Sequence, residues 1–383
     1  MKILIVITKS ELGGAQVFAL NLARGLKAAG INVTVAGGPG EYLPAELEKA
    51  GVPFKRLKNL ERSRDPFKSL RFVSELKAYV AAEEFDVVHL NSTNALLGIW
   101  GLNRLEPKPR VVFTIHGLSL LDSGYQASGI MKIAYRLFFS AAFKKLDGLA
   151  FVSRLNMDSM IRSGLLKGGL EKKSRVIYNG LDFAPGYLLE REKARAELSA
   201  IMKLSPEAKA DFQDAFIYGS IGRLAYPKNY EFLINTHKAV KALKPKAKLL
   251  LIGEGPEREK YEGLIRSYKL ENDVLLSGEI RDASRYLEAF DLFVLSSIFE
   301  GLSLSLIEAV RAEVPALATR VGGNEEIIGA ENCFKLNDQA DFLDKVGQGA
   351  KKVEVFAADE AALRSSNFSN LAMISSYLEF YRG

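Results

Sequence analysis

The stretch LFVLSSIFEGLSLSLIEAVRAEVPALAT, residues 292–319, decides the fold. Its first four residues, Leu292–Leu295, predict a central parallel strand, and residues 306–314 predict a helix that a following proline ends. Glu300 then falls in the loop between strand and helix, and Glu308 falls about one turn inside the helix. Because open α/β sheets bind ligands at the carboxyl ends of their strands, we expect both carboxylates at a binding edge.

The same alternation of short apolar runs with helical patterns fills the rest of the chain. Examples are KILIVIT and RVVFTIHG in residues 1–182, and FIYGSIGRL and KLLLIGEG in residues 183–365. Gly and Pro interrupt the periodicity between these halves, in YNGLDFAPG, residues 178–186. Continuous apolar runs are typical of strands buried on both faces. The sequence therefore predicts an α/β protein of two doubly wound parallel sheets, in domains 1–182 and 183–365. A last amphipathic helix, 366–383, is expected to return to the N-terminal domain.

Composition limits the classes of function. The chain has 383 residues, 48% of them hydrophobic and 26% charged, which is typical of a soluble globular protein with room for two cores. Its single cysteine, Cys333, excludes an internal disulfide framework and a thiolate metal cluster, and favours a reducing cytoplasm. The first apolar run is too short for a signal peptide or a membrane span, so we expect a cytoplasmic protein.

The net charge of +6 is concentrated between residues 55 and 77. The basic residues at the centre of this patch are Arg62, Arg64, Lys68 and Arg71. Such a patch suits an anionic membrane surface, a phosphorylated ligand or nucleic acid. No helix-turn-helix, zinc-finger or RNP pattern supports nucleic acid. We expect the patch to contact a membrane or an anionic acceptor.

A second candidate surface is the stretch GIMKIAYRLFFSAAFKKLDG, residues 129–148. It is almost wholly apolar, and from residue 132 to residue 144 a polar residue stands at every fourth position, which predicts a polar stripe on a helix. The polar residues of this spacing are Lys132, Arg136, Ser140 and Lys144. Two interpretations stay open. One is a buried helix with a single solvent-exposed polar edge, and the other is a surface helix that binds to anionic lipid.

Glycines follow the first predicted strand in SELGGAQ. Gly13 and Gly14 allow a close backbone approach, and a helix beginning near Ala15 would aim free N–H groups at the loop, where they attract anions. No Gly-Lys-Ser/Thr follows, so this is not a Walker A loop. A simple tight turn is the alternative.

Three further residues stand at the carboxyl ends of predicted strands. Arg223 and Lys228 share one loop in SIGRLAYPKN. The planar guanidinium of arginine can bind two phosphate oxygens at once and the ammonium group of lysine acts as a compact charge, so together they could hold a diphosphate. The alternative is a solvated basic loop. His116 ends the run TIHG, and its alternative is a structural histidine.

Taken together, these motifs resemble the retaining glycosyltransferases of family GT4, a GT-B group related to sucrose-phosphate synthases, mannosyltransferases and lipopolysaccharide glucosyltransferases. The motifs GGAQ, TIHG, FVS, YNGLD, GRLAYPKN, IGEGP, EGLSLSLIEA and a final GG occur in the order of that family. The resemblance covers nearly the whole chain. It implies two Rossmann-like domains facing a central cleft, with the acceptor on the N-terminal side and the nucleotide-sugar donor on the C-terminal side.

The resemblance also implies roles for individual residues. Glu300 would contact the hydroxyl groups of the donor sugar, Glu308 the ribose, and His116 would lie near the sugar. The implied catalytic residues are His116, Glu300, Arg223 and Lys228. The implied contacts to the diphosphate and the rest of the donor are Gly13, Gly14, Arg223, Lys228, Gly301, Leu302 and Ser303. The chain departs from the family at Glu313, where many relatives have Gly, and at Gln16, where they often have an acid.

The resemblance implies transfer from a nucleotide-sugar, with UDP the commonest choice in the family, to a glycan or lipid-linked acceptor in envelope polysaccharide or lipopolysaccharide biosynthesis. We expect no metal and no cofactor. No Asp-x-Asp motif occurs, and the three histidines lack metal-ligand spacing. Arg, Lys and a helix N-terminus can stabilise a leaving diphosphate in place of Mg²⁺.

Two other functions stay open at this point. A nucleotide-sugar epimerase of the same architecture would need an acid/base set around C2 of the sugar, and no carboxylate cluster demands one. A nucleic-acid-binding protein is suggested only by the net positive charge of the chain.

Overall fold

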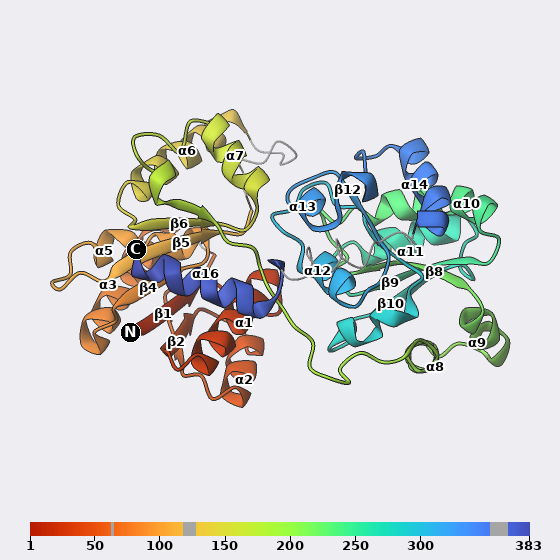
Figure 1. Cartoon of the computed structure of the whole chain (residues 1–383), viewed down its shortest axis with the longest axis horizontal. Helices are drawn as coiled ribbons and strands as arrows, with labels where there is room; N and C mark the ends of the chain where they lie inside the picture. Colours follow the sequence, from red (N-terminus) through yellow and green to blue (C-terminus); the bar gives the residue numbers. More distant parts are fainter. Residues whose placement is uncertain (63–64, 118–127, 353–366) are drawn as a thin grey trace. The chain divides into compact units, whose positions relative to one another are not determined.

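The computed structural model describes residues 1–62, 65–117, 128–352 and 367–383. The chain divides into two compact units, each described here by itself (Figure 1). Unit 1 consists of Met1–Leu181 together with Asn367–Gly383, and unit 2 of Asp182–Ser366. The boundary expected from the sequence, between residues 182 and 183, lies one residue from this division.

Unit 1 is built on a seven-stranded parallel sheet in the order β3-β2-β1-β4-β5-β6-β7. Its strands are β1 (Lys2–Ile7), β2 (Asn32–Gly37), β3 (Phe54–Arg56), β4 (Val87–Leu90), β5 (Arg110–Ile115), β6 (Gly148–Phe151) and β7 (Ser174–Val176). The residues of β1, β4, β5 and β6 are almost all buried, as expected for a sheet covered on both faces.

Helices cover both faces of this sheet. They are α1 (Gly14–Ala28), α2 (Tyr42–Lys49), α3 (Pro66–Glu83), α4 (Thr93–Leu96), α5 (Ile99–Leu102), α6 (Gly129–Phe143), α7 (Arg154–Arg162), the 3-10 turn η2 (Glu171–Lys173) and α16 (Asn370–Arg382). One core contains Phe18 of α1 and Tyr377 of α16, and the other contains Phe72 of α3 and Phe143 of α6. The helices α1, α2 and α16 therefore lie on one face, and α3 to α6 on the other.

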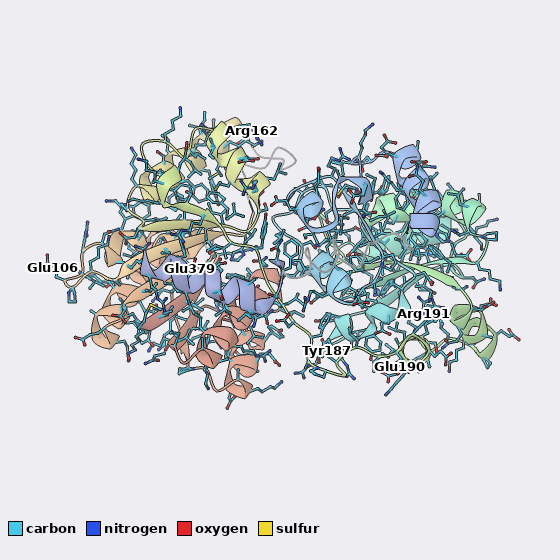
Figure 2. All side chains as sticks on the ribbon, viewed as in Figure 1. Glu106, Arg162, Tyr187, Glu190, Arg191 and Glu379 are labelled. Carbon is cyan, nitrogen blue, oxygen red and sulfur yellow. The ribbon has the colours of Figure 1, made fainter. Side chains whose placement is uncertain are left out.

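The final helix α16 packs beside α1 in unit 1 (Figure 1). The Tyr381 hydroxyl lies 2.7 Å from Nδ1 of His89 in β4, and the Tyr377 hydroxyl lies 2.9 Å from the Thr114 hydroxyl in β5. Glu379, labelled in Figure 2, lies on the exposed face of the helix. The last seventeen residues thus belong to unit 1, and two tyrosines of α16 bond to its central strands β4 and β5.

Unit 2 contains a six-stranded parallel sheet in the order β10-β9-β8-β11-β12-β13. Its strands are β8 (Phe216–Ile221), β9 (Ala247–Ile252), β10 (Val274–Gly278), β11 (Leu292–Leu295), β12 (Ala316–Thr319) and β13 (Cys333–Phe334). Its helices are α8 (Arg191–Ile201), α9 (Pro206–Gln213), α10 (Tyr230–Leu243), α11 (Arg258–Ser267), η3 (Ala283–Ala289), α12 (Leu304–Arg311), α13 (Asn324–Ile328), η4 (Ala330–Asn332) and α14 (Gln339–Lys352). The prediction of two doubly wound parallel sheets is confirmed.

The strand order fixes where each unit can bind a ligand. In unit 1 the order reverses at β1, which pairs with both β2 and β4. In unit 2 it reverses at β8, which pairs with both β9 and β11. At such a point the loops that follow neighbouring strands run to opposite faces and open a crevice at the carboxyl edge.

The prediction of a helix over residues 306–314 is wrong at both ends. The Ser303 side chain caps the helix, so α12 starts at Leu304. At the other end Glu313 takes a left-handed conformation with φ 57°, and Val314 N–H bonds back to the Ala309 carbonyl. Glycine is favoured at such a left-handed cap, which gives a physical reason for the glycine that the resemblance leads one to expect at this position. Glu313 takes the same conformation without that advantage.

Candidate active site

Two loops at the carboxyl edge of the unit 2 sheet carry its candidate charged residues. The loop after β8 holds Arg223 and Lys228, and the loop after β11 leads through Glu300 to α12. Because β8 and β11 are hydrogen-bonded neighbours at the reversal of strand order, these loops start from adjacent strand ends and border the same crevice.

Lys228 and Glu300 form an ion pair at this edge. Lys228 Nζ lies 2.6 Å from Glu300 Oε1, and the Ser297 hydroxyl donates a 2.7 Å hydrogen bond to the same oxygen. Burial lowers the pKa of Lys228, but the charge of Glu300 and the neighbouring Tyr230 outweigh it, so the pKa lies above its ordinary value. Lys228 is therefore a firmly cationic group, 22% exposed, at the ligand-binding edge.

Further hydrogen bonds hold the two loops together. Ile298 N–H donates to the Pro227 carbonyl at 2.9 Å, and the Ser296 hydroxyl donates to the Lys228 carbonyl at 3.0 Å. The side-chain amide of Asn229 donates to the Ser296 carbonyl at 3.2 Å. The backbone beneath the ion pair is thus fixed before any ligand arrives.

The N-terminus of α12 lies directly after Glu300. Ser303 caps the helix and is 4% exposed, and the adjacent Leu302 is 6% exposed. Gly323 N–H donates to the Gly301 carbonyl at 2.8 Å, which ties this loop to the one after β12. A helix N-terminus leaves its first backbone N–H groups without helical partners, and these groups attract anions.

Gly322 allows the close approach of these two loops. It has φ +53°, and a Cβ atom there would collide with the carbonyl oxygen of Glu300. Glycine is the residue that adopts this conformation without a steric penalty. The glycine pair at residues 322–323 therefore supports the backbone of the Glu300 loop.

Glu308 is half-buried one turn inside α12. Burial raises the pKa of its carboxyl group to about 7, and the group has no hydrogen bond or ion pair among the described residues. The next basic residue on the helix, Arg311, bonds instead to Asp182 at 2.6 Å. Tyr187, labelled in Figure 2, has its pKa raised by burial and further by the charges of Asp282 and Glu308. Glu308 is thus an unpaired carboxyl group suited to a hydroxyl ligand.

Arg223 lies on the exposed part of the loop after β8. In the described chain its guanidinium makes no hydrogen bond or ion pair. The loop itself is held by Leu224, whose N–H donates to the Glu254 carbonyl at 3.0 Å and whose carbonyl accepts from Glu257 N–H at 2.9 Å. A fixed loop therefore carries, in addition to Lys228, an exposed cation without a partner among the described residues.

Gly13, Gly14 and His116 belong to unit 1 rather than to this cluster. α1 begins at Gly14, and the Gly13 carbonyl accepts the first helical hydrogen bonds. His116 follows β5 directly, and its Nε2 lies 3.2 Å from Oδ1 of Asn91, the residue after β4. Burial lowers the pKa of His116 to about 4. The carboxyl edge of unit 1 thus holds a helix N-terminus and a neutral histidine.

Two polar residues at these edges were missed by the sequence analysis. Ser297 bonds to Glu300, and Asn91 bonds to His116. Asn91 is the first residue after the apolar strand in VVHLN, and Ser297 is the second residue after the apolar strand in FVLSS. Their position at a strand's carboxyl end was the signal that could have identified them.

Some basic side chains of the patch 55–77 already bond within the protein and are not available to a partner. Arg56 donates to the carbonyls of Gly38 and Gly40, and Lys68 pairs with Glu61 at 2.6 Å. Of the four residues at the centre of the patch, Arg62 and Arg71 are exposed and make no ion pair among the described residues, while Arg64 lies outside the described residues. Beside them on α3, Phe67 and Leu70 are 71% and 66% exposed.

Helix α6 carries a second exposed apolar surface. Ile130, Ile133 and Leu137, which share one face of the helix, are 82%, 60% and 67% exposed, while Phe139 and Phe143 are buried. The interpretation of a buried helix with one polar edge is therefore wrong, because its outer face is largely apolar. None of the helices in the described residues has the length and apolar content that crossing a bilayer requires.

Comparisons with known proteins agree with this architecture. The family model for Glycosyltransferase Family 4 matches residues 12–184, and the model for Glycosyl transferases group 1 matches residues 203–350. The uncharacterized glycosyltransferase MJ1059 of Methanocaldococcus jannaschii is 35% identical over 216 residues, which are 56% of this chain and 48% of that protein. The chain thus spans about half the length of this relative.

Two further proteins are similar over more of their length. The Escherichia coli UDP-Gal:alpha-D-GlcNAc-diphosphoundecaprenol alpha-1,3-galactosyltransferase is 25% identical over 314 residues, 79% of this chain and 72% of that protein. The crystal structure of Anabaena Alr3699/HepE in complex with UDP has a TM-score of 0.78 over 99% of both chains, with 18% sequence identity. At this identity the likeness shows the shared fold. Because the two family models match one unit each, this protein belongs to the family 4 glycosyltransferases and has their GT-B fold of two parallel-sheet domains.

Proposed function

We propose that this glycosyltransferase moves a sugar from a UDP-sugar to a glycan or lipid-linked acceptor in envelope polysaccharide biosynthesis, with retention of configuration and without a metal ion. The observation that carries the proposal is the cluster of Lys228, Glu300 and Ser297 beside the N-terminus of α12. It combines a cation, backbone N–H groups and a fixed carboxylate within one binding edge.

The diphosphate of the donor binds to Lys228, Arg223 and the backbone N–H groups from Gly301 to Ser303. As the bond between C1 of the sugar and the phosphate oxygen breaks, its electron pair stays on the diphosphate. Fixed positive groups stabilise this developing charge better in the transition state than in the ground state. Because Glu300 raises the pKa of Lys228, the lysine remains charged throughout.

Carboxylates bind the neutral parts of the donor. Glu300 accepts hydrogen bonds from the sugar hydroxyl groups, and Glu308 accepts from the ribose. By family resemblance His116 contacts the donor sugar. The acceptor oxygen bonds to C1 on the face that the diphosphate leaves, and its proton passes to a phosphate oxygen. This route gives retention and needs no enzyme nucleophile.

The relatives support the choice of substrates. One is a galactosyltransferase whose name gives a UDP-sugar donor and a diphosphoundecaprenol-linked acceptor, and one structural neighbour is a complex with UDP. A lipid-linked acceptor also fits the exposed apolar and basic residues of α3 and α6. In this proposal the two helices contact an anionic membrane at its cytoplasmic face.

A donor panel tests the proposed reaction. The full chain is incubated with UDP-, GDP- and ADP-sugars and a diphospholipid-linked acceptor in the presence of EDTA, and free nucleotide is measured. We expect release from a UDP-sugar that EDTA does not reduce, and a product that keeps the anomeric configuration of the donor. Release only after a divalent metal is added, or an inverted product, would contradict the mechanism.

Liposome sedimentation tests the membrane contact. Wild-type protein should bind vesicles that contain anionic lipid and dissociate as salt rises, because screening removes the attraction. Reversal of Arg62, Arg64, Lys68 and Arg71 to Glu should abolish binding, since each basic residue near the surface contributes about 1 kcal/mol. Donor hydrolysis should persist in that variant.

A matched control reverses four exposed basic residues of unit 2, which are Lys193, Lys209, Arg266 and Lys269. This control should sediment with anionic vesicles as the wild type does. Wild-type protein that stays in the supernatant at low salt would refute the membrane contact.

A further inference from the structure

Asn91 and His116 meet at the carboxyl edge of unit 1. Asn91 is 1% exposed, and its backbone N–H donates to the Val6 carbonyl at 2.9 Å, as a continuation of the pairing between β1 and β4. Its Oδ1 lies 3.2 Å from Nε2 of His116. The asparagine is therefore a buried, fixed partner of the histidine.

The orientation of the Asn91 amide follows from its second hydrogen bond. Its Nδ2 donates to the backbone carbonyl of His89 at 3.1 Å. A carbonyl oxygen only accepts, so a rotated amide would place two oxygen atoms against each other. Oδ1 must then face His116, and since this oxygen also only accepts, His116 Nε2 must carry the proton.

The rest of the environment keeps His116 neutral. The ring of Phe18 packs edge-on against the imidazole, with 4.6 Å between ring centroids, and burial lowers the pKa of His116 to about 4. The nearby titratable group, His89, also has a pKa well below its ordinary value, through burial first and the proximity of His116 second. A neutral imidazole with its proton on Nε2 has a lone pair on Nδ1, and this nitrogen has no partner among the described residues.

We infer that Asn91 is a positioning residue that holds His116 in the Nε2-protonated tautomer, so that Nδ1 accepts a hydrogen bond from a hydroxyl group of the donor sugar. This inference rests on the proposed function of His116. The opposite tautomer would present an N–H group, which suits a phosphate oxygen. Asn91 thus selects the chemical class of group that His116 binds.

Nitrogen NMR of histidine-labelled protein reads the tautomer directly. The chain has three histidines, so the His116 signals can be assigned by their loss in His116→Ala. The wild type should show a protonated Nε2 and an unprotonated Nδ1 near neutral pH. Asn91→Leu, which removes the acceptor, should give a detectable population of the other tautomer. An unchanged Nε2-protonated signal in Asn91→Leu would overturn the inference.

Kinetics separate this role from simple support of the fold. Asn91→Leu should lower transfer on the order of tenfold, the loss expected for one hydrogen bond. It should leave the affinity for free UDP unchanged, because free UDP lacks the transferred sugar that His116 is proposed to contact. In Asn91→Asp the carboxylate should raise the pKa of His116. His116 would then be protonated on both nitrogens at low pH, so transfer should be weak there and recover as pH rises.

Ser92→Ala serves as the matched control at the same strand end, since the Ser92 hydroxyl bonds to Thr8 and not to His116. It should keep the wild-type histidine signals. A change of tautomer in Asn91→Leu without loss of transfer would overturn the inference. Full transfer by His116→Ala would overturn it differently, by showing that the proposed function of the histidine is wrong.

Discussion

Lys228→Ala is expected to lower kcat by roughly 10²–10³-fold, the effect of removing one fixed charge-stabilising donor from an active site. The KM for the donor should rise much less, because the charge on the departing diphosphate is greatest in the transition state. Arg223→Ala should cause a smaller loss of kcat, since its exposed guanidinium is not held by any described residue. Steady-state kinetics with a UDP-sugar measures both effects.

Lys241→Ala is the matched control for Lys228→Ala. Lys241 also forms an ion pair within unit 2, with Asp273 at 2.5 Å, but it lies in the last turn of α10, far along that helix from the loop after β8. Its loss should leave kcat near the wild-type value. Equal losses of kcat in the two variants would mean that Lys228 acts through stability rather than through the leaving group.

The fold and much of the candidate site could be predicted from the sequence because the strands are continuous apolar runs. Such runs locate the carboxyl end of each strand, and Arg223, Lys228, Glu300 and His116 all follow one. The short edge strands β3 and β13 were missed. β3 is three residues long and contains two basic residues, and β13 has only two residues, so neither has a readable apolar pattern.

Pairings between distant residues could not be predicted. The partners Lys228 and Glu300 are 72 positions apart, and they meet because β11 lies beside β8 in the sheet. Periodicity gives the strands but not their order. For the same reason, the sequence does not show which residues of the basic patch are already paired. Counting charges did not reveal that Arg56 and Lys68 bond within the protein.

The two glutamates should differ sharply in their effect on UDP. Glu308→Gln removes a charged acceptor from the ribose and should weaken UDP binding by roughly 10- to 100-fold. Glu300→Gln should leave UDP affinity unchanged or raise it, because Lys228 loses its partner and becomes free for the diphosphate. Transfer should nevertheless fall by at least about 10²-fold in Glu300→Gln, since the contact to the sugar is lost.

Calorimetric titration of UDP into the wild type, Glu300→Gln and Glu308→Gln tests the central claim, that the carboxyl edge of β8 and β11 binds the nucleotide. The titration is run at pH 6 and pH 8. Because burial raises the pKa of Glu308 to about 7, its carboxylate forms only as pH rises through that value, and wild-type affinity should increase from pH 6 to pH 8. The terminal phosphate of UDP also ionises near pH 6, and this ionisation by itself should raise the affinity slightly between pH 6 and pH 8. Glu308→Gln, which lacks the titrating carboxyl group, should show only this smaller rise in affinity and therefore serves as the reference. Equal UDP affinities for all three proteins, with equal pH dependence, would contradict the claim.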